Sequence, residues 1–134
     1  MHNHCQVYIA CLALAVTLFA GEKDLAGVYT GKWSGASGAA GDFRIALALA
    51  DGKLKPDVMF TMGSTEVKTK VTHIAVDGMK LEMKYEFDLN GVRLESTIHG
   101  TLGGEVLEGR YSTKSVADGS AADEGEWKAT RQSN

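Results

Sequence analysis

Pairs of turn-forming residues recur along most of this chain, and their spacing constrains the fold more than any other feature. Asn-Gly and Asp-Gly pairs between alternating apolar and polar runs are strong signals of tight β-hairpins, because both central residues of such turns need a positive φ angle. The chain also contains a single proline and no long segment of helical period. We therefore predict an antiparallel meander whose tight turns are Asp51-Gly52, Gly63-Ser64, Asp77-Gly78, Asn90-Gly91 and Gly103-Gly104.

The segments between the turns predict an all-β fold of eight strands. Residues 79–89 show the pattern most clearly, since apolar side chains alternate there with Lys, Glu and Asp. An eight-stranded up-and-down (meander) β-barrel would cover the apolar face without a helix and leave no free sheet edge, and its charged outer face is unlike a lipid-facing surface. A two-sheet sandwich is the alternative. The expected strands are residues 27–34, 42–50, 53–62, 65–76, 79–89, 92–102, 105–114 and 125–132.

Two-residue turns fix which residues lie opposite each other in a hairpin. Counting outward from the turns places apolar side chains opposite apolar side chains on the inner face, and it places Asp88 opposite Arg93 on the outer face. The expected inward pairs include Phe43–Phe60, Ile45–Val58, Tyr85–Ser96, Met83–Ile98 and Ser96–Tyr111.

The turn at Asp77-Gly78 breaks this rule, because a strict register places the apolar Val71 opposite the charged Lys84. One extra residue in the strand before the turn would restore apolar pairing by placing Val71 opposite Met83. We therefore predict a β-bulge near Thr72 and His73.

Residues 1–20 have the character of a signal peptide. Residues 7–20 form an unbroken apolar run with charges beginning at Glu22, and a run of this length suits an export signal better than a membrane span. We expect cleavage after Ala20, an extracytoplasmic (periplasmic or secreted) location and one β-barrel domain over residues 21–134; a retained membrane anchor is the alternative. Both cysteines, Cys5 and Cys11, lie in the signal segment, so we expect no disulfide in the mature domain.

The composition argues against several classes of function. The formal net charge is −3 and no basic patch is visible, so nucleic acid and anionic membranes are not expected partners of the mature domain. No Ser–His–carboxylate set converges in the predicted interior, no cysteine is left there, and no phosphate-binding loop is present. We expect a non-catalytic protein without cofactors; an isomerase or cyclase built on a barrel ranks third among the alternatives.

The segment Gly31-Lys32-Trp33 on the first predicted strand, the eight-strand layout and the export signal resemble the calycin group of small barrels, which includes lipocalins and avidins. The resemblance covers nearly the whole mature chain in layout and is closer to avidins, because lipocalins follow their barrel with a helix. It implies a barrel that binds a small molecule; biotin is not implied, since the only later tryptophan is Trp127. In lipocalins an arginine on the last strand packs over the first-strand tryptophan, and the resemblance gives this role to Arg131.

Both long connections, residues 34–41 and 115–124, fall at the same end of the predicted barrel. Trp33 ends its strand at this end among other inward-facing aromatic residues, and such a collar suits the entry of an apolar ligand. A row of inward-facing hydroxyl groups crosses four adjacent strands and consists of Thr69, Tyr85, Ser96 and Tyr111. Buried hydroxyls need partners, which can be one another, a buried water or a ligand. The expected ligand-binding residues are Tyr29, Trp33, Thr69, Tyr85, Ser96, Tyr111 and Trp127.

Inward-facing glycines at positions 31, 100 and 109 leave room beside the hydroxyl row, so we expect any cavity to lie next to them. These features predict an exported protein that binds a small apolar or amphipathic molecule. The alternative is a structural or interaction module of the cell envelope with a filled barrel, because eight strands leave an interior that side chains can fill.

Two outer-face patterns complete the sequence-based expectations. Rows of His and Glu can bind metals, but they also form ordinary cross-strand ion pairs, and we expect no metal in this protein. The row here consists of His73, Glu82, His99 and Glu108. A stripe of small residues on the second strand can let a second copy pack closely in a homo-oligomer; the alternative is an outer face that is only weakly polar and has no partner. The stripe consists of Ala46, Ala48 and Ala50.

Overall fold

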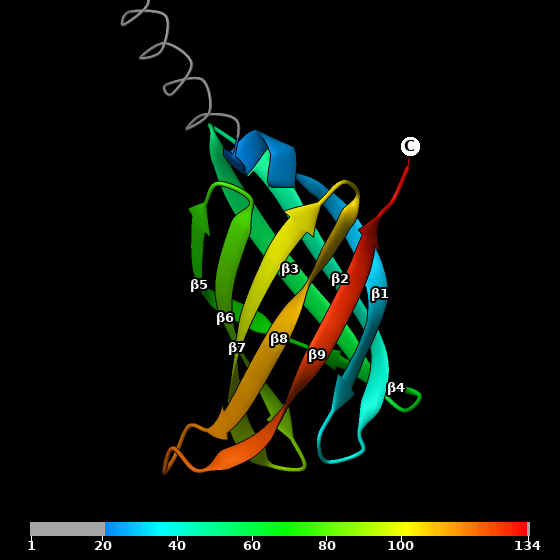
Figure 1. Ribbon diagram of the computed structural model, residues 1–134. Helices are drawn as coiled ribbons and strands as arrows, with labels where there is room; N and C mark the ends of the chain where they lie inside the picture. The colour runs from blue at the N-terminus through cyan, green and yellow to red at the C-terminus, as the bar shows by residue number, and fades with distance from the viewer. Residues whose placement is uncertain (1–20, 134) are drawn as a thin grey trace, which may run out of the picture.

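The computed structural model describes residues 21–133 and places most of them in one antiparallel sheet (Figure 1). It confirms the all-β prediction but contains nine strands instead of eight. The predicted signal peptide, residues 1–20, lies outside the described residues. Within residues 21–133, no helix has the length and apolar character needed to cross a membrane. The strands are β1 (Gly27–Gly35), β2 (Ala40–Ala50), β3 (Lys53–Met62), β4 (Thr65–Lys68), β5 (Lys70–Asp77), β6 (Lys80–Leu89), β7 (Val92–Gly103), β8 (Val106–Ser115) and β9 (Ala121–Arg131).

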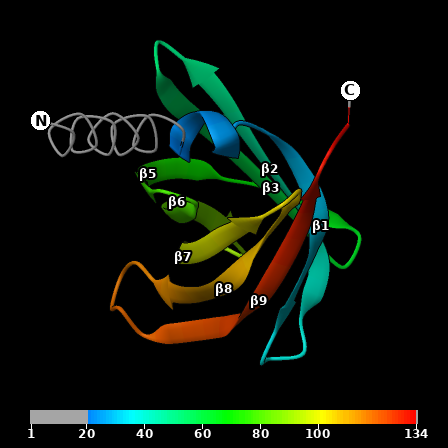
Figure 2. The same cartoon turned by 45° about the horizontal axis from the view of Figure 1, so that its top comes forward.

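The sheet curls into a barrel-like shape around an apolar interior (Figure 2). Its strand order is β4-β3-β2-β1-β9-β8-β7-β6-β5, so sequential strands are neighbours except for β4 and β5, and β1 also pairs with β9. The two edge strands, β4 and β5, are consecutive in the chain, with only Thr69 between them. A single curled sheet forms, and the two-sheet sandwich considered as the alternative does not.

The predicted fourth strand, residues 65–76, is divided at Thr69 because its two halves pair with different neighbours. β4 pairs with the end of β3, and β5 pairs with β6. The Thr69 hydroxyl donates a hydrogen bond to the Val58 carbonyl at 2.7 Å, at the point where the β3 ladder stops. The first half of β3 contains Pro56, which has no N–H to give to a ladder. The result is a curled half-barrel, which corrects the prediction of a fully closed eight-stranded barrel.

The hairpin registers predicted around Asp51-Gly52 and Asn90-Gly91 are confirmed. Phe43 lies opposite Phe60 in the first hairpin, and Tyr85 lies opposite Ser96 in the second. Both residues of each turn have positive φ, 54° and 76° in the first turn and 53° and 79° in the second. This pattern is that of a type I′ turn, whose twist matches the flanking strands.

The hairpin between β7 and β8 turns one residue later than predicted. Gly103 pairs with Val106 in the ladder, and the loop consists of Gly104, with φ of 62°, and Glu105. A turn that needs positive φ only at its first position takes a single leading glycine. The predicted register is therefore wrong, and Ser96 lies opposite Thr113 instead of Tyr111.

The hairpin between β5 and β6 also turns one residue later than predicted. Its loop is Gly78-Met79, and Gly78 has φ of 62°. The β-bulge predicted at Thr72 and His73 is confirmed, because the register shifts between Val71 and His73. The predicted partner of Val71 is wrong: because the turn lies one residue later, Val71 lies opposite Tyr85 instead of Met83.

A short helix over residues 21–25 covers one end of the barrel, a feature that the strand pattern did not predict (Figure 1). Leu25 from this helix is fully buried in the core. Tyr29 is also fully buried, and its hydroxyl donates a hydrogen bond to the Leu25 carbonyl at 2.8 Å. This helix, and not a loop between strands, therefore closes the apolar interior at this end.

Arg131 fixes the helix to the end of the sheet. Its guanidinium lies 5.3 Å from the centre of the Tyr29 ring and donates hydrogen bonds to the carbonyls of Asp24, at 2.6 Å, and Ala26, at 3.3 Å. The calycin resemblance predicted that Arg131 would pack over Trp33. That prediction is wrong, because the aromatic residue beneath Arg131 is Tyr29.

Candidate functional site

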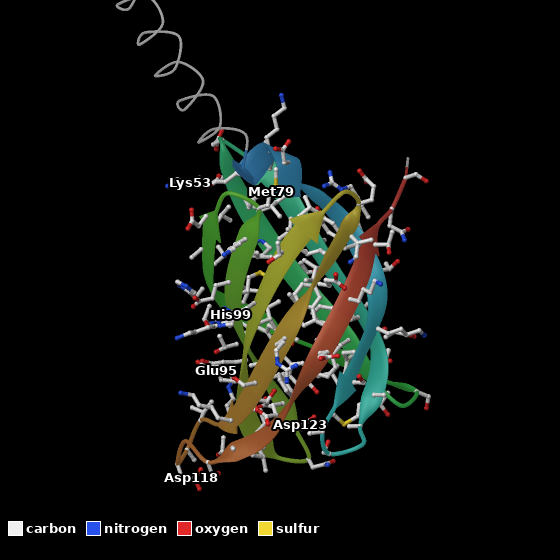
Figure 3. All side chains as sticks on the ribbon, viewed as in Figure 1. Lys53, Met79, Glu95, His99, Asp118 and Asp123 are labelled. Atoms are coloured by element: carbon white, nitrogen blue, oxygen red, sulfur yellow. The ribbon has the colours of Figure 1, made fainter. Side chains whose placement is uncertain are left out.

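The end of the barrel opposite the helix holds a cavity of about 240 Å³. Figure 3 labels Asp118 and Asp123 at this end and Lys53 and Met79 at the helix end. The lining is mainly aromatic and aliphatic, and among residues 21–133 Asp123 is the only charged residue in it. A cavity of about 150 Å³ is enough to hold benzene in a protein core. The space is therefore sufficient for a small organic molecule.

Aromatic rings from six strands form the walls of the cavity. Trp33 packs edge-to-face against Phe60 and Tyr111, with ring centres 5.8 and 5.9 Å apart. Phe60 also meets Phe87 at 5.0 Å. Edge-to-face contacts of this kind hold aromatic side chains in fixed orientations, so the walls are ordered before any ligand enters.

The two indole N–H groups are satisfied by backbone carbonyls. Trp33 Nε1 donates to the Thr61 carbonyl at 2.9 Å, and Trp127 Nε1 donates to the Arg110 carbonyl at 3.2 Å. Since the polar edge of each indole is engaged with the sheet, each ring contributes apolar surface to the cavity. Trp33 and Trp127 lie opposite each other on β1 and β9.

A pair of hydroxyl groups forms the polar part of the inner wall. Ser96 on β7 and Thr113 on β8 are both buried, and their hydroxyl oxygens lie 2.6 Å apart. One of them donates to the other, and the accepting hydroxyl still has a proton to donate. Burial raises the pKa of the neighbouring Tyr85 well above its ordinary value, and a hydrogen bond with the Ser96 side chain lowers it by a smaller amount. The phenol is therefore neutral at pH 7.

Tyr111 and Asp123 form a second polar group at the rim. The Tyr111 hydroxyl donates to Asp123 Oδ2 at 2.9 Å, and the Ser37 backbone N–H donates to Oδ1 at 3.1 Å. Burial acts to raise the pKa of Asp123, but these hydrogen bonds outweigh it and hold the pKa below its usual value. Burial and the nearby Asp123 carboxylate together raise the pKa of Tyr111. The pair is therefore a carboxylate and a neutral phenol at pH 7.

Gly35 at the end of β1 allows this pair to approach the sheet. A Cβ atom at Gly35 would collide with Asp123 Oδ2 and would lie 2.5 Å from the Tyr111 hydroxyl. The loop over residues 36–39 is also tied to β9, because Ala36 N donates to the Glu124 carbonyl at 2.7 Å. The glycine-rich connection is thus anchored beside the cavity.

The structure brings five of the seven predicted ligand-binding residues to the cavity: Trp33, Tyr85, Ser96, Tyr111 and Trp127. Tyr29 and Thr69 do not line it. Tyr29 lies under Arg131 at the helix end, and the Thr69 hydroxyl is engaged with the Val58 carbonyl at the edge of the sheet. The four-residue hydroxyl row is therefore not continuous.

Thr113 and Asp123 are among the cavity residues that the sequence-based prediction missed. The wrong turn position placed Tyr111 where Thr113 lies, opposite Ser96. Asp123 was assigned to a connection, whereas β9 begins at Ala121. Extending the alternation back from Trp127 would have placed Asp123 on the inner face, because alternate residues of a strand share a face.

The predicted position of the cavity beside three inward glycines is wrong. At Gly31 and Gly109, a Cβ atom would collide with backbone carbonyls of the adjoining strands, those of Lys128 and His99. At Gly100, a Cβ atom would lie 2.6 Å from the Trp127 ring. These glycines permit close packing of strands and of one indole, and they do not border the cavity.

The outer-face row of His and Glu is not aligned as predicted. Glu82 does lie opposite His99, and His73 Nε2 lies 3.6 Å from Glu82 Oε1. However, the later turn places His99 opposite Arg110 instead of Glu108. Within the described part of the chain, no three His, Cys, Asp or Glu side chains are grouped as a metal site would require.

Comparison of the chain with protein-family models gives no match. Comparisons with curated proteins and with solved structures give no match either. The calycin resemblance stays a prediction, and the function is inferred from the geometry of the cavity alone.

Proposed function

We propose that this protein is an exported, non-catalytic β-barrel that binds one small apolar or amphipathic molecule at its open end. The observation that supports the proposal is the cavity of about 240 Å³, with aromatic walls and a buried Ser96–Thr113 hydroxyl pair. Small-molecule sites are typically concave and mostly apolar, with a few convergent polar groups that orient the ligand. The accepting hydroxyl of the pair has a proton that a ligand oxygen or nitrogen can receive.

The volume of the cavity favours this function over the alternative of an envelope module with a filled barrel. Protein interiors are close-packed, and voids much larger than a water molecule are few in each domain. A purely structural barrel of this size would gain dispersion energy by filling the space with side chains. Retention of the space is expected if it serves a ligand.

Native mass spectrometry of protein purified from its own host tests the proposal directly. The expected result is a mass excess that corresponds to one small molecule and that is lost on denaturation. For protein that carries no such molecule, titration with the neutral fluorophore N-phenyl-1-naphthylamine provides a second test. A bare mass together with no fluorescence response would reject the proposed function.

A pair of variants locates the binding site. Ser96→Phe places a ring inside the cavity and is expected to abolish the fluorescence response, because the added volume occupies the ligand space. Thr97→Phe, at the next position on β7, adds the same ring on the opposite side of the strand and is the matched control. Equal binding by both variants would show that the probe binds elsewhere. Urea unfolding of each variant establishes that it is folded.

A further inference from the structure

We propose that the ligand of this cavity is cationic: an apolar, aromatic-sized molecule with a protonated amine that lies against Asp123. The inference rests on the proposed small-molecule function and adds the class of ligand. Its basis is the charge, hydrogen bonding and ring arrangement around Asp123 at the rim of the cavity.

The charge balance of the cavity is the first observation. Asp123 is the only charged residue that lines it, and in the described part of the chain Asp123 makes no ion pair with a Lys, Arg or His side chain. Its hydrogen bonds come from neutral donors, which are the Tyr111 phenol, the N–H and hydroxyl of Ser37 and the Glu124 N–H. A half-buried carboxylate beside an apolar cavity is therefore left without a positive partner, and an ammonium group would supply one.

The fixed position of the Asp123 carboxylate is the second observation. Oδ2 accepts from the Tyr111 hydroxyl and Oδ1 accepts from the Ser37 N–H, and hydrogen bonding from the Ser37 hydroxyl and the Glu124 N–H also favours the ionised form. The absence of a side chain at Gly35 and these donors hold the carboxylate in place. A fixed acceptor loses little conformational entropy when it binds a donor.

The rings next to the carboxylate are the third observation. Trp33 and Tyr111 pack edge-to-face, with an angle of 85° between their planes, and both line the cavity with Asp123. Aromatic faces attract ammonium groups electrostatically, and tryptophan does so most strongly. A carboxylate ligand would meet repulsion from Asp123 and no cation in the lining, so anionic amphiphiles are disfavoured.

Three probes that share one ring test the inference: 2-phenylethylamine, 2-phenylethanol and 3-phenylpropanoate. Each is titrated into the full mature domain at pH 7 and fixed ionic strength, with isothermal calorimetry and tryptophan fluorescence as readouts. The amine is expected to bind about tenfold more tightly than the alcohol, because hydrogen bonds between charged partners are stronger than neutral ones. The carboxylate is expected to bind most weakly.

Two neighbouring substitutions then assign the preference to Asp123. Asp123→Asn keeps the size of the side chain and removes its charge, and is expected to weaken amine binding about tenfold while alcohol binding changes less than about threefold. Glu124→Gln removes the same charge from the next residue of β9, which is exposed and lies outside the cavity lining, and is the matched control. Retained alcohol binding shows that Asp123→Asn is folded.

The outcomes separate the two proposals. Equal wild-type affinities for amine and alcohol, or a loss of amine affinity in Glu124→Gln as large as in Asp123→Asn, would overturn the cationic ligand and leave the small-molecule function in place. Tighter binding of 3-phenylpropanoate than of the amine would also overturn the cationic ligand and leave the small-molecule function in place. No binding of any of the three probes, and none of N-phenyl-1-naphthylamine, would reject both proposals.

Discussion

At the scale of single residues, the Tyr111–Asp123 contact sets the ionisation of the cavity rim. The phenol donates to the carboxylate, so it stabilises the charged form and lowers the pKa of Asp123. We predict that Tyr111→Phe raises the pKa of Asp123. Carboxyl ¹³C NMR titration of the wild type and the variant measures the change. Asp118 is an internal control, because its lowered pKa depends on hydrogen bonds from Ser120 and not on Tyr111.

The same titration has a consequence for stability. A carboxyl whose folded-state pKa is depressed contributes stability above its unfolded pKa, about 4, and loses it as the pH falls through the folded-state pKa. The wild type is therefore expected to keep the Asp123 contribution to a lower pH than Tyr111→Phe does. An unchanged Asp123 pKa in the variant would contradict the assigned cause.

The Ser96–Thr113 pair makes a separate prediction about buried hydroxyls. Ser96→Ala leaves the Thr113 hydroxyl without its partner and is expected to lower the free energy of unfolding by about 1–3 kcal/mol. The double variant Ser96→Ala/Thr113→Val removes both polar groups and is expected to recover part of that loss. Urea unfolding of the four proteins in the cycle measures the coupling. Fully additive losses would show that the two hydroxyls do not depend on each other.

At the scale of elements, the hairpin after β7 shows how one turn decides the content of the cavity. Gly104 has positive φ and Gly103 does not, although both positions have free space for a Cβ atom. We predict that Gly104→Ala lowers the free energy of unfolding by about 1 kcal/mol, whereas Gly103→Ala has little effect or stabilises slightly. Thermal or urea unfolding of the two variants checks this. Equal losses would favour the turn position predicted from the sequence.

The sequence predicts the elements best where a turn has one interpretation. Asn90-Gly91 occupies both positive-φ positions, so counting from it correctly placed Tyr85 and Ser96 on the inner face. Gly104 follows another glycine and Gly78 follows an aspartate, so each was assigned to the second turn position although it occupies the first. The Asp51-Gly52 turn, which was placed correctly, shows that an Asp-Gly pair alone does not decide between the two positions. A turn moved by one residue shifts the pairing by two. That shift is why Thr113 was missed while its neighbours were found.

The division of the fourth strand had no local signal in the sequence. Residues 65–76 alternate well enough to predict one strand, and the break at Thr69 depends on which neighbour each half reaches when the sheet curls. The buried helix over residues 21–25 is similarly defined by tertiary contacts, since five residues do not form a stable helix alone. Both features follow from closure of the sheet and not from local propensity.

At the scale of the whole molecule, the two ends of the barrel have different structures. One end is sealed by Leu25, Tyr29 and Arg131, and the other contains the cavity with its anchored rim. Cleavage after Ala20, as the sequence predicts, would leave all five residues of the sealing helix in the mature chain. The export signal would then end directly before the sealing helix begins. The mature domain would keep this helix at one end and the open cavity at the other.

This separation of the ends predicts that stability and ligand binding can be changed independently. Leu25→Ala empties a fully buried position at the sealed end and is expected to lower the free energy of unfolding by about 2–5 kcal/mol. The affinity for 2-phenylethylamine should not change, because the cavity lies at the opposite end. Leu49→Ala is the control, since Leu49 is 45% exposed and its loss should cost much less. Urea unfolding and calorimetry on the same samples measure both quantities.

Two outcomes would contradict this prediction. A Leu25→Ala protein that stays as stable as Leu49→Ala would mean that the helix does not seal the barrel in solution. A large loss of affinity for 2-phenylethylamine in Leu25→Ala would mean that the two ends are coupled.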